Sequence, residues 1–375
     1  MAATDVLIVG AGVTGLAAAL ACRRAGLSVR VLERQAPGAG ASGGLVGALA
    51  PFQPDPWSAK KAFQVSALAG AEAYWAEVAA ASGVDPGYGR VGRLQPLEDA
   101  AARARAVAQG AAAARHWPKA FRWEVLDAAP EAAGWAAGPH GAVWDGLSAR
   151  LHPRRAVAAL AAALVSAGGL LSPGVAVRAV GPGGAGTDAG PVAAGLVVVA
   201  AGNGSDALLA PLVSGPPRRG VKGQAARLAG APGRSLLAAP GLYVVPHGDG
   251  TTAVGSTREP DWTDGAATDA GLDALLASAA RLAPALAGAA VLARWAGVRP
   301  RAPRPEPMLG WVGPGVLVAT GSLGIGIGLA PALGAAVARL AQGQDPGLPP
   351  GFSPAAHGLL PRDVEVGPGE GANIG

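Results

Sequence analysis

Three glycines near the N-terminus have the spacing of a loop that binds a dinucleotide. The segment from Gly10 to Gly15 reads Gly-Ala-Gly-Val-Thr-Gly, and Glu33 follows 18 residues after it. In such loops the first glycine permits a tight turn, Gly12 lets the backbone approach a pyrophosphate, and the third glycine lets helix and strand pack closely. Glu33 would accept a hydrogen bond from a ribose 2′-hydroxyl and repel a 2′-phosphate, which disfavours NADP. A chance Gly-rich turn is the alternative in a chain with 59 glycines.

The elements around this loop must place it at the end of a strand. The apolar run 5–9 predicts a buried parallel strand, residues 14–25 predict a helix that ends at Gly26, and 27–32 predict a second strand that ends in Glu33. This order is one complete strand–helix–strand unit. The candidate cofactor-binding residues therefore also include Val13 and Thr14 in the loop and Arg34 after Glu33. The unit alone does not distinguish NAD from FAD.

The rest of the chain alternates helices, short strands and Gly-rich loops. Apolar periodicity and the placement of glycine and proline predict each element. The predicted elements are a helix over 60–81, a helix from Pro153 to 168, strands over 175–180 and 195–201, a hairpin over 242–257 that turns at 248–250, and a helix over 272–286. The Pro/Gly-rich tail beyond Gln342 is expected to be loosely ordered.

Composition bounds the class of protein. Half of the residues are hydrophobic and 15% are charged, which predicts a folded chain of two or three domains despite 59 glycines and 33 prolines. Cys22 is the single cysteine, which excludes an internal disulfide, a four-cysteine zinc site and a cysteine-ligated iron–sulfur cluster. No two histidines have metal-ligand spacing, so no metal is expected. The simplest compartment is a reducing one, and we expect a cytoplasmic protein.

Charge and hydropathy argue against two other classes. The net charge is +5, but no basic run exceeds two residues, unlike the clustered patches that bind nucleic acid. The stretch 316–338 contains 23 uncharged residues, as a membrane span would. Its glycines and Pro331 favour a buried strand, a Gly-rich loop and an Ala/Leu-rich helix instead. We expect no membrane span.

Four further segments occur in an order that a known family shares. They are Gly38-Ala39-Gly40-Ala41-Ser42-Gly43-Gly44 with Gly47 and Ala50-Pro51, then Val221-Lys222-Gly223-Gln224, then Trp295-Ala296-Gly297-Val298-Arg299-Pro300, and finally Ala319-Thr320-Gly321 through Pro331. With the first loop, the chain from Asp5 to about 340 resembles the D-amino-acid-oxidase-like FAD-dependent oxidoreductases, the family of glycine and sarcosine oxidases.

The resemblance implies a two-domain α/β fold. A Rossmann-like FAD-binding domain of the glutathione-reductase type would be interleaved with a substrate domain built on an antiparallel sheet. The implied boundaries are 1–86, 148–218 and 290–342 for the FAD-binding domain, 87–147 and 219–289 for the substrate domain, and 343–375 for the tail.

The same resemblance implies roles for single residues. Arg299 would bind the substrate carboxylate, since a guanidinium pairs with a carboxylate through a planar fork, and Tyr243 would contact the same group. The alternatives are an interdomain arginine and a tyrosine at the edge of the core. The implied cofactor contacts, besides the first loop, are Ala41, Ser42, Gly43, Gly47, Val175, Ala201, Gly202, Gly321, Gly324, Ile325, Gly326 and Ile327. FAD would be bound non-covalently, because Cys22 lies in the first helix and no histidine precedes His116.

Two positions depart from the glycine oxidase pattern. Gly324-Ile325 stands where glycine oxidases carry an Arg-Asn pair, and Arg258 stands where they carry an apolar residue. The charge of the substrate pocket would therefore have moved to Arg258, which we include among the catalytic candidates. Glycine itself becomes a doubtful substrate, and a larger or more acidic amino acid is favoured.

The implied activity is oxidation of the C–N bond of a small amino acid or N-substituted glycine, with hydride transfer to flavin N5 and oxygen or another electron acceptor. One alternative is an FAD-dependent oxidoreductase that modifies the wobble uridine of tRNA, which makes tRNA an open partner although a methyltransferase domain is missing. Another is a catalytically silent FAD-bound interaction protein. An NAD-dependent dehydrogenase fits least, because 316–331 would then have no role. The sequence leaves a homo-oligomer open.

Overall fold

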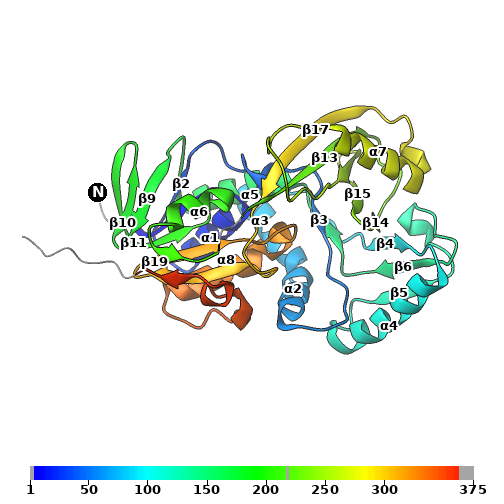
Figure 1. Ribbon diagram of the computed structural model, residues 1–375, viewed down its shortest axis with the longest axis horizontal. Coiled ribbons are helices and arrows are strands. Elements are labelled where there is room, and N and C mark those ends of the chain that lie inside the picture. The colour runs from blue at the N-terminus through cyan, green and yellow to red at the C-terminus, as the bar shows by residue number, and fades with distance from the viewer. Residues whose placement is uncertain (1–3, 217–218, 363–375) are drawn as a thin grey trace, which may run out of the picture.

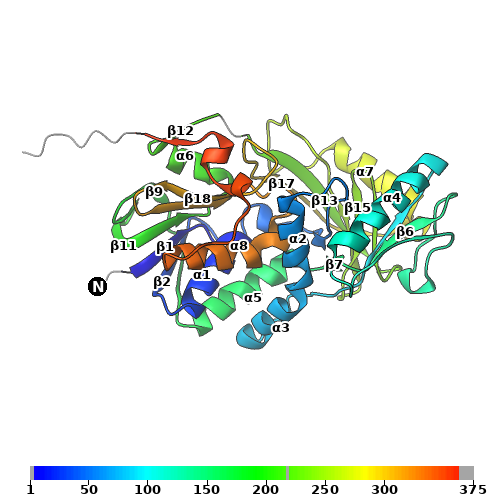
Figure 2. The same ribbon diagram turned by 90° about the horizontal axis from the view of Figure 1, so that it is seen from below.

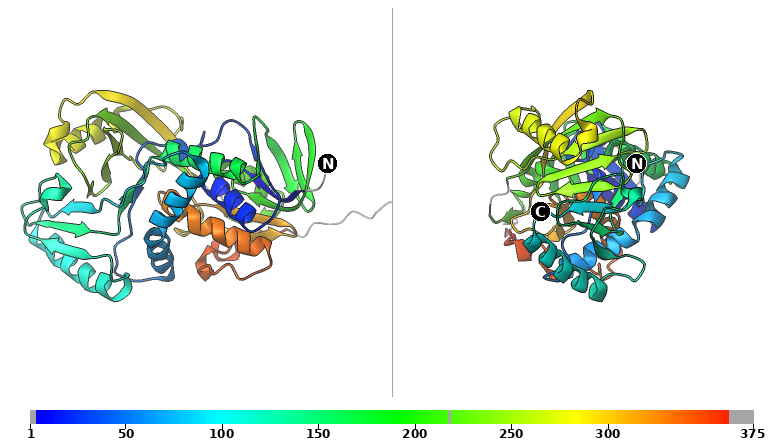
Figure 3. Two further views of the ribbon diagram at one scale, coloured as in Figure 1. Left: turned by 180° about the vertical axis from the view of Figure 1, so that it is seen from behind. Right: turned by 90° about the vertical axis from the view of Figure 1, so that its right-hand side faces the viewer.

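The computed structural model describes residues 4–216 and 219–362. Its two large sheets lie at opposite ends of the long axis, and helices α2 (Ala59–Ala69) and α3 (Ala71–Ser82) lie between them (Figures 1 and 3). The chain passes between the two regions several times, so each sheet is assembled from segments that are distant in sequence. The fold is the mixed α/β architecture that the sequence predicts, with one parallel and one antiparallel region.

The first sheet has a parallel centre. Strand β1 (Thr4–Val9) pairs with β2 (Val29–Glu33) on one side and with β11 (Gly190–Val199) on the other. The order across the sheet is β18-β19-β11-β1-β2-β8, in which β18 runs antiparallel to β19, and β9 and β10 add an antiparallel ribbon to β11. The remaining strands of this sheet are β8 (Leu170–Pro173), β9 (Val177–Gly181), β10 (Gly184–Thr187), β18 (Met308–Gly313) and β19 (Val316–Thr320). Fully buried and largely apolar segments such as β19 suit a sheet that is covered on both faces.

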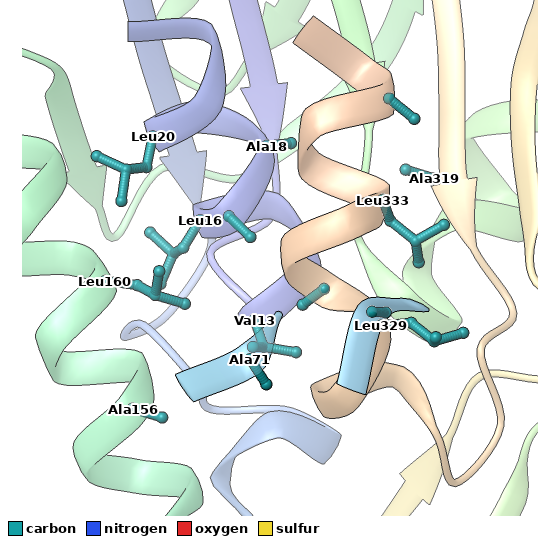
Figure 4. Packing of buried hydrophobic residues seen from close by; sticks show 14 of the residues in the cluster. Val13, Leu16, Ala18, Leu20, Ala71, Ala156, Leu160, Ala319, Leu329 and Leu333 are labelled. Carbon is teal, nitrogen blue, oxygen red and sulfur yellow. The ribbon is translucent and has the colours of Figure 1, made fainter. Parts of the chain in front are cut away.

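Three helices cover one face of this sheet: α1 (Val13–Arg24), α5 (Pro153–Ser166) and α8 (Gly326–Ala341). They lie side by side in Figure 2, and Figure 4 shows Leu16 of α1 facing Leu160 of α5. Helices α1 and α8 pack so closely that a Cβ built on Gly334 would lie 2.7 Å from the backbone of Ala17. The opposite face packs against α6 (Ser205–Leu209) and the β9–β10 ribbon.

The second sheet has eight strands in the order β17-β13-β16-β15-β14-β4-β6-β5, and only the β14–β4 pair is parallel. One face packs on α7 (Ala270–Leu282) through a cluster that includes Leu228, Val244 and Leu272. Helix α4 (Ala100–His116) packs beside β5. The strands are β4 (Arg93–Pro96), β5 (Trp123–Leu126), β6 (Ala142–Asp145), β13 (Val221–Ala229), β14 (Leu236–Ala239), β15 (Leu242–Pro246), β16 (Thr251–Gly255) and β17 (Val291–Arg299).

Two-stranded pairings complete the fold. Strands β3 (Ala48–Leu49) and β7 (Ala149–Arg150) pair where the chain passes between the two regions, and β12 (Val213–Ser214) pairs with β20 (Leu360–Pro361). The structure confirms the strand–loop–helix reading of 316–338 as β19, a loop and α8. Within the described residues, no helix is long and apolar enough to cross a membrane.

Three expectations about elements need correction. The helix over 60–81 is two helices, because Gly70 ends α2 and begins α3. The segment 291–299, assigned above to the FAD-binding domain, is β17 and pairs with β13 in the second sheet. The tail is ordered as far as Arg362, because Phe352 and His357 are buried and β20 pairs with β12. The part of the tail from 363 to 375 lies outside the described residues.

Candidate active site

The loops that follow the parallel strands of the first sheet meet at one edge, because parallel strands share the direction of their carboxyl ends. Reading across the sheet, the loops begin at Gly321 after β19, at Ala201-Gly202 after β11, at Gly10 after β1, at Glu33-Arg34 at the end of β2, and near Val175 after β8. The Val175 N–H donates to the Glu33 carbonyl oxygen at 2.9 Å. The structure therefore brings the predicted first-loop residues, Glu33 and Val175 to a single edge.

Side chains hold the first loop in place. The Glu33 carboxylate accepts the N–H groups of Ala11 and Gln35, each at 2.9 Å, and the Ser42 hydroxyl accepts the Val13 N–H at 3.0 Å. Gly10 has a φ of 107°, a backbone conformation that would be strained for any residue with a side chain. A Cβ on Gly15 would lie 2.0 Å from a backbone oxygen, so only glycine allows helix α1 to approach so closely.

The second Gly-rich segment lies between the two sheets. Ala41, Ser42 and Gly43 form a short 3₁₀ helix. Gly47 has a φ of 67°, and a Cβ there would lie 1.7 Å from the Leu151 carbonyl oxygen, so both its backbone angle and its surroundings require glycine. Beyond this helix, Gly44 approaches the Trp295 ring, and a Cβ on Gly255 would meet Val46. This segment therefore connects the carboxyl edge of the first sheet to one face of the second.

The terminal loop precedes α8. Gly321 and Gly324 have φ values of 79° and 73°, and Ile325 is the N-cap of the helix. Gly324 to Ile327 are predicted cofactor contacts, but the Ile325 N–H donates to the Ser322 carbonyl oxygen, and the Gly328 N–H donates to the Ile325 carbonyl oxygen. The N–H groups of Gly324, Gly326 and Ile327 are therefore the better candidates. The Ser322 hydroxyl beside them is buried and has no partner among the described residues.

Tyr243, Trp295 and Arg299 share one face of the second sheet. Trp295 pairs with Ala225, Ala225 with Gly255, and Gly255 with Tyr243, so these residues form one cross-strand row. Arg299 lies four residues beyond Trp295 on β17 and therefore points to the same face. This face is opposite α7, and the segment from Gly44 to Val46 lies against it.

The Arg299 guanidinium is held by three strong hydrogen bonds. Nη1 donates to the Ser256 hydroxyl at 2.9 Å, and Nη2 donates to the carbonyl oxygens of Thr257 at 2.7 Å and Lys222 at 3.2 Å. Burial and then the positive charge of Arg258 lower the pKa of Arg299, while Glu259 opposes them. One Nη1 hydrogen remains for a ligand, and Nε makes only a weak bond at 3.5 Å to the Val221 carbonyl oxygen. The guanidinium is therefore not arranged to bind a carboxylate through two parallel hydrogen bonds.

A partly buried polar network surrounds the segment that holds Arg299, with Lys222 and Gln224 buried and Asp269 exposed. The Lys222 ammonium group lies 3.3 Å from the Glu259 carboxylate and 3.1 Å from that of Asp269. Gln224 donates to both carboxylates and accepts the Asp269 N–H. Lys222 and Gln224 belong to the motif described above, but the motif does not indicate this network, because Glu259 and Asp269 lie elsewhere in the sequence.

A buried ion pair beside Tyr243 was also missed. Arg93 of β4 donates from Nε to Asp145 of β6 at 2.6 Å and from Nη1 to the Tyr243 hydroxyl at 3.0 Å. Arg93 is 5% exposed and Asp145 is fully buried. Burial alone would lower the pKa of Arg93, but Asp145 and Tyr243 outweigh it and the pKa is raised. The strand pairing that joins these residues has no local sequence signal.

Two histidines lie between the Gly-rich segment and the second sheet. The His247 ring bonds to the Leu45 carbonyl oxygen at 3.0 Å, and its centroid lies 5.0 Å from that of His152. Burial lowers the pKa of His247 to about 4.

The single cysteine lies inside α1, away from the loops, and burial raises the pKa of the Cys22 thiol to about 12. The two histidines and Cys22 are therefore uncharged and part of the packing at neutral pH.

The carboxyl edge fits a dinucleotide. Gly12 begins α1 without a side-chain cap, and a Cβ there would approach the Ser42 hydroxyl at 3.2 Å. The Val13 N–H already donates to Ser42, so the N–H groups of Thr14 and Gly15 in the first turn are the candidates to bind a diphosphate. The Glu33 carboxylate lies at the end of the next strand, the position that contacts a ribose. The fold and this edge are those of a dinucleotide-binding protein, and the segment from Gly44 to Val46 connects the edge to the antiparallel sheet.

Comparison with known proteins agrees with this class. The model of the FAD dependent oxidoreductase family, DAO, matches residues 5–340. The chain belongs to this family and is an FAD-dependent amino-acid oxidoreductase. The predicted family and fold class are thereby confirmed.

Relatives cover nearly the whole chain. Glycine oxidase of Pseudomonas aeruginosa is 32% identical over 93% of this chain and 98% of its own. The crystal structure of glycine oxidase from Geobacillus kaustophilus has a TM-score of 0.83 and 26% identity, and covers 95% of this chain and 98% of its own. A tRNA 5-methylaminomethyl-2-thiouridine biosynthesis bifunctional protein of Chromohalobacter salexigens matches over 47 residues, 12% of this chain and 7% of its own. That short match does not support tRNA as a partner.

Proposed function

We propose that this enzyme oxidises the C–N bond of an amino acid or N-substituted glycine that carries additional negative charge, with non-covalent FAD and with oxygen as the final acceptor. The amine would lose a hydride and a proton to become an imine, which water would hydrolyse to a carbonyl acid and the free amine. FAD, when bound, would accept the two electrons and pass them to oxygen, giving hydrogen peroxide. Two proteins named glycine oxidase match this chain over 98% of their own length, and these matches support the reaction class.

The observation that carries the proposal is the sheet face with Tyr243, Trp295 and Arg299, against which the segment from Gly44 to Val46 lies. A carboxylate placed between Arg299 and Tyr243 would receive one guanidinium N–H and one phenol O–H. Two such bonds orient a substrate while leaving its α-carbon unobstructed. Tyr243, Trp295 and Arg299 are half-buried, and this partial shielding from water would strengthen both bonds.

Arg258 supports the additional negative charge. It is exposed, close enough to Arg299 to lower the pKa of that group, and engaged by no hydrogen bond or ion pair within residues 4–216 and 219–362. Two neighbouring guanidinium groups repel each other, and a second carboxylate on the substrate would relieve that repulsion. We therefore propose a substrate with two carboxylates, such as D-aspartate or iminodiacetate, in preference to glycine.

Anaerobic bleaching of the visible flavin band tests the reaction. Glycine, sarcosine, D-proline, D-aspartate, iminodiacetate and larger D-amino acids are each added to the purified holoenzyme. We expect the dicarboxylates to bleach the band fastest. Persistent colour with every amine would leave a catalytically silent flavoprotein and refute the proposed function.

A pair of variants tests the role of Arg258. Arg258→Met is expected to raise KM for the preferred dicarboxylate about tenfold, the size of one hydrogen bond between charged groups, and to change KM for sarcosine little. Arg294→Met is the matched control, because Arg294 lies on β17 and pairs instead with Asp273 at 2.7 Å. Equal effects of Arg258→Met on both substrates would contradict the assignment.

A further inference from the structure

Arg93 bonds to three different parts of the molecule. It pairs with Asp145 across the β4–β6 ladder, donates to the Tyr243 hydroxyl on β15, and reaches the Pro51 carbonyl oxygen at 3.4 Å. The second Asp145 oxygen accepts the Ser148 N–H at 2.9 Å, so the carboxylate is fixed as well. A buried charged pair with this many bonds does not reorient easily.

The chemistry of arginine decides the direction of the Tyr243 hydroxyl. A guanidinium only donates hydrogen bonds, so the Tyr243 oxygen must act as the acceptor from Arg93. The phenol then has its single O–H left, and that hydrogen must point away from Arg93. Tyr243 lies on the face shared with Trp295 and Arg299, where the proposed substrate carboxylate would accept it.

We infer that Arg93, held by Asp145, is a positioning residue that fixes Tyr243 as a hydrogen-bond donor to the substrate carboxylate. The inference rests on the proposed function, because it requires a carboxylate at this face. Arg93 would act entirely through Tyr243 and would not touch the substrate. Its removal should therefore have no effect on carboxylate binding once the Tyr243 hydroxyl is gone.

A double-mutant cycle on the FAD-loaded enzyme tests this dependence. The proteins are wild type, Tyr243→Phe, the neutral pair Arg93→Gln with Asp145→Asn, and the combination of all three substitutions; the probe is acetate, titrated against the visible flavin spectrum. Glutamine can accept as well as donate, so the neutral pair no longer fixes the direction of the Tyr243 hydroxyl. We expect Tyr243→Phe and the neutral pair each to weaken acetate binding about tenfold, and the combination to be no weaker than Tyr243→Phe alone. Losses that multiply, giving about a hundredfold in the combination, would overturn the inference.

Arg90→Gln is the matched control. Arg90 lies in the same segment, and its partners are Glu72 and the carbonyl oxygens of Leu147, Leu68 and Ala69. This variant should bind acetate as wild type does. Arg93→Lys is a second check, because an ammonium group also only donates, so this variant should bind acetate more tightly than the neutral pair does. If the neutral pair does not fold, Arg93→Met with Asp145→Asn replaces it in the cycle, with the same expected outcome.

Failure of the proposed function gives a different result. If no amine bleaches the flavin but acetate binds and the cycle is non-additive, the positioning role stands and the oxidase assignment falls. If acetate at any attainable concentration leaves the wild-type spectrum unchanged, no carboxylate site exists at this face and the inference falls with the proposed substrate.

Discussion

Acid should destabilise this enzyme through His247, and His247→Gln should remove most of that sensitivity. The His247 ring is 3% exposed and bonds to the Leu45 carbonyl oxygen. Glutamine can keep that bond through its amide N–H but does not titrate. The folded state therefore retains its packing while the proton-binding group is lost.

The size of the effect follows from the pKa of His247, which is lowered from 6.5 to about 4. Between these pH values the unfolded chain binds a proton that the folded chain does not, so stability falls as the pH falls. The loss begins near pH 6.5 and is complete near pH 4, and it amounts to about 3 kcal/mol. Desolvation is the main cause. His152 and Arg150 add to it, while the Leu45 carbonyl oxygen and Asp249 oppose it.

Urea unfolding of the FAD-loaded proteins at about pH 7 and about pH 4 measures this difference. Between the two pH values, the free energy of unfolding of wild type should fall by about 3 kcal/mol more than that of His247→Gln. Burial also lowers the pKa of His152, so the variant should keep a smaller acid sensitivity in the same direction. His140→Gln, at an exposed position, is the control and should follow wild type. Equal losses in wild type and His247→Gln would refute the reasoning.

Three further substitutions test the fold and the site. Gly334→Ala gains about 1 kcal/mol of helix propensity but places a Cβ 2.7 Å from the backbone of Ala17. Thermal unfolding should therefore show a net loss of stability of about 1–2 kcal/mol. The control is Gly313→Ala, whose Cβ would lie in open space, and it should change stability by less than about 0.5 kcal/mol. Arg299→Ala should keep FAD and slow flavin reduction by carboxylated amines about a hundredfold in stopped-flow measurements, and near-normal rates would refute its assignment. Gly12→Val should yield colourless protein because the side chain blocks backbone approach to the diphosphate, whereas Gly181→Val, on β9 with nothing within 4 Å, should stay yellow.

Much of the fold follows from local patterns. The predicted strand–helix–strand unit appears as β1, α1 and β2, and the predicted hairpin appears as β15 and β16 with its turn at Gly250. Both are short-range units whose hydrophobic period and turn residues lie in one stretch of chain. The helix break at Gly70 was missed because a glycine within an apolar stripe is also compatible with a continuous helix.

The cofactor edge was predictable and the substrate face only in part. Gly10, Gly12 and Glu33 form one contiguous motif, whereas Arg93, Asp145 and Tyr243 meet through pairings between β4, β6 and β15. No local pattern specifies which strands become neighbours in an antiparallel sheet. The engagement of Arg299 by Thr257 and Ser256 likewise depends on a loop conformation that its own motif does not encode.

The close crossing of α1 and α8 has a consequence for synthesis on the ribosome. Helix α1 is complete at Arg24 and packs against two helices: α5, which begins at Pro153, and α8, which begins only at Gly326, about 300 residues later. At about 5–20 residues per second, the side of α1 that packs on α8 remains uncovered by it for roughly 15–60 s. The terminal loop of the cofactor edge is made in the same late segment. Nascent chains should therefore need chaperone protection, and they should acquire FAD only once nearly the whole chain has left the ribosome.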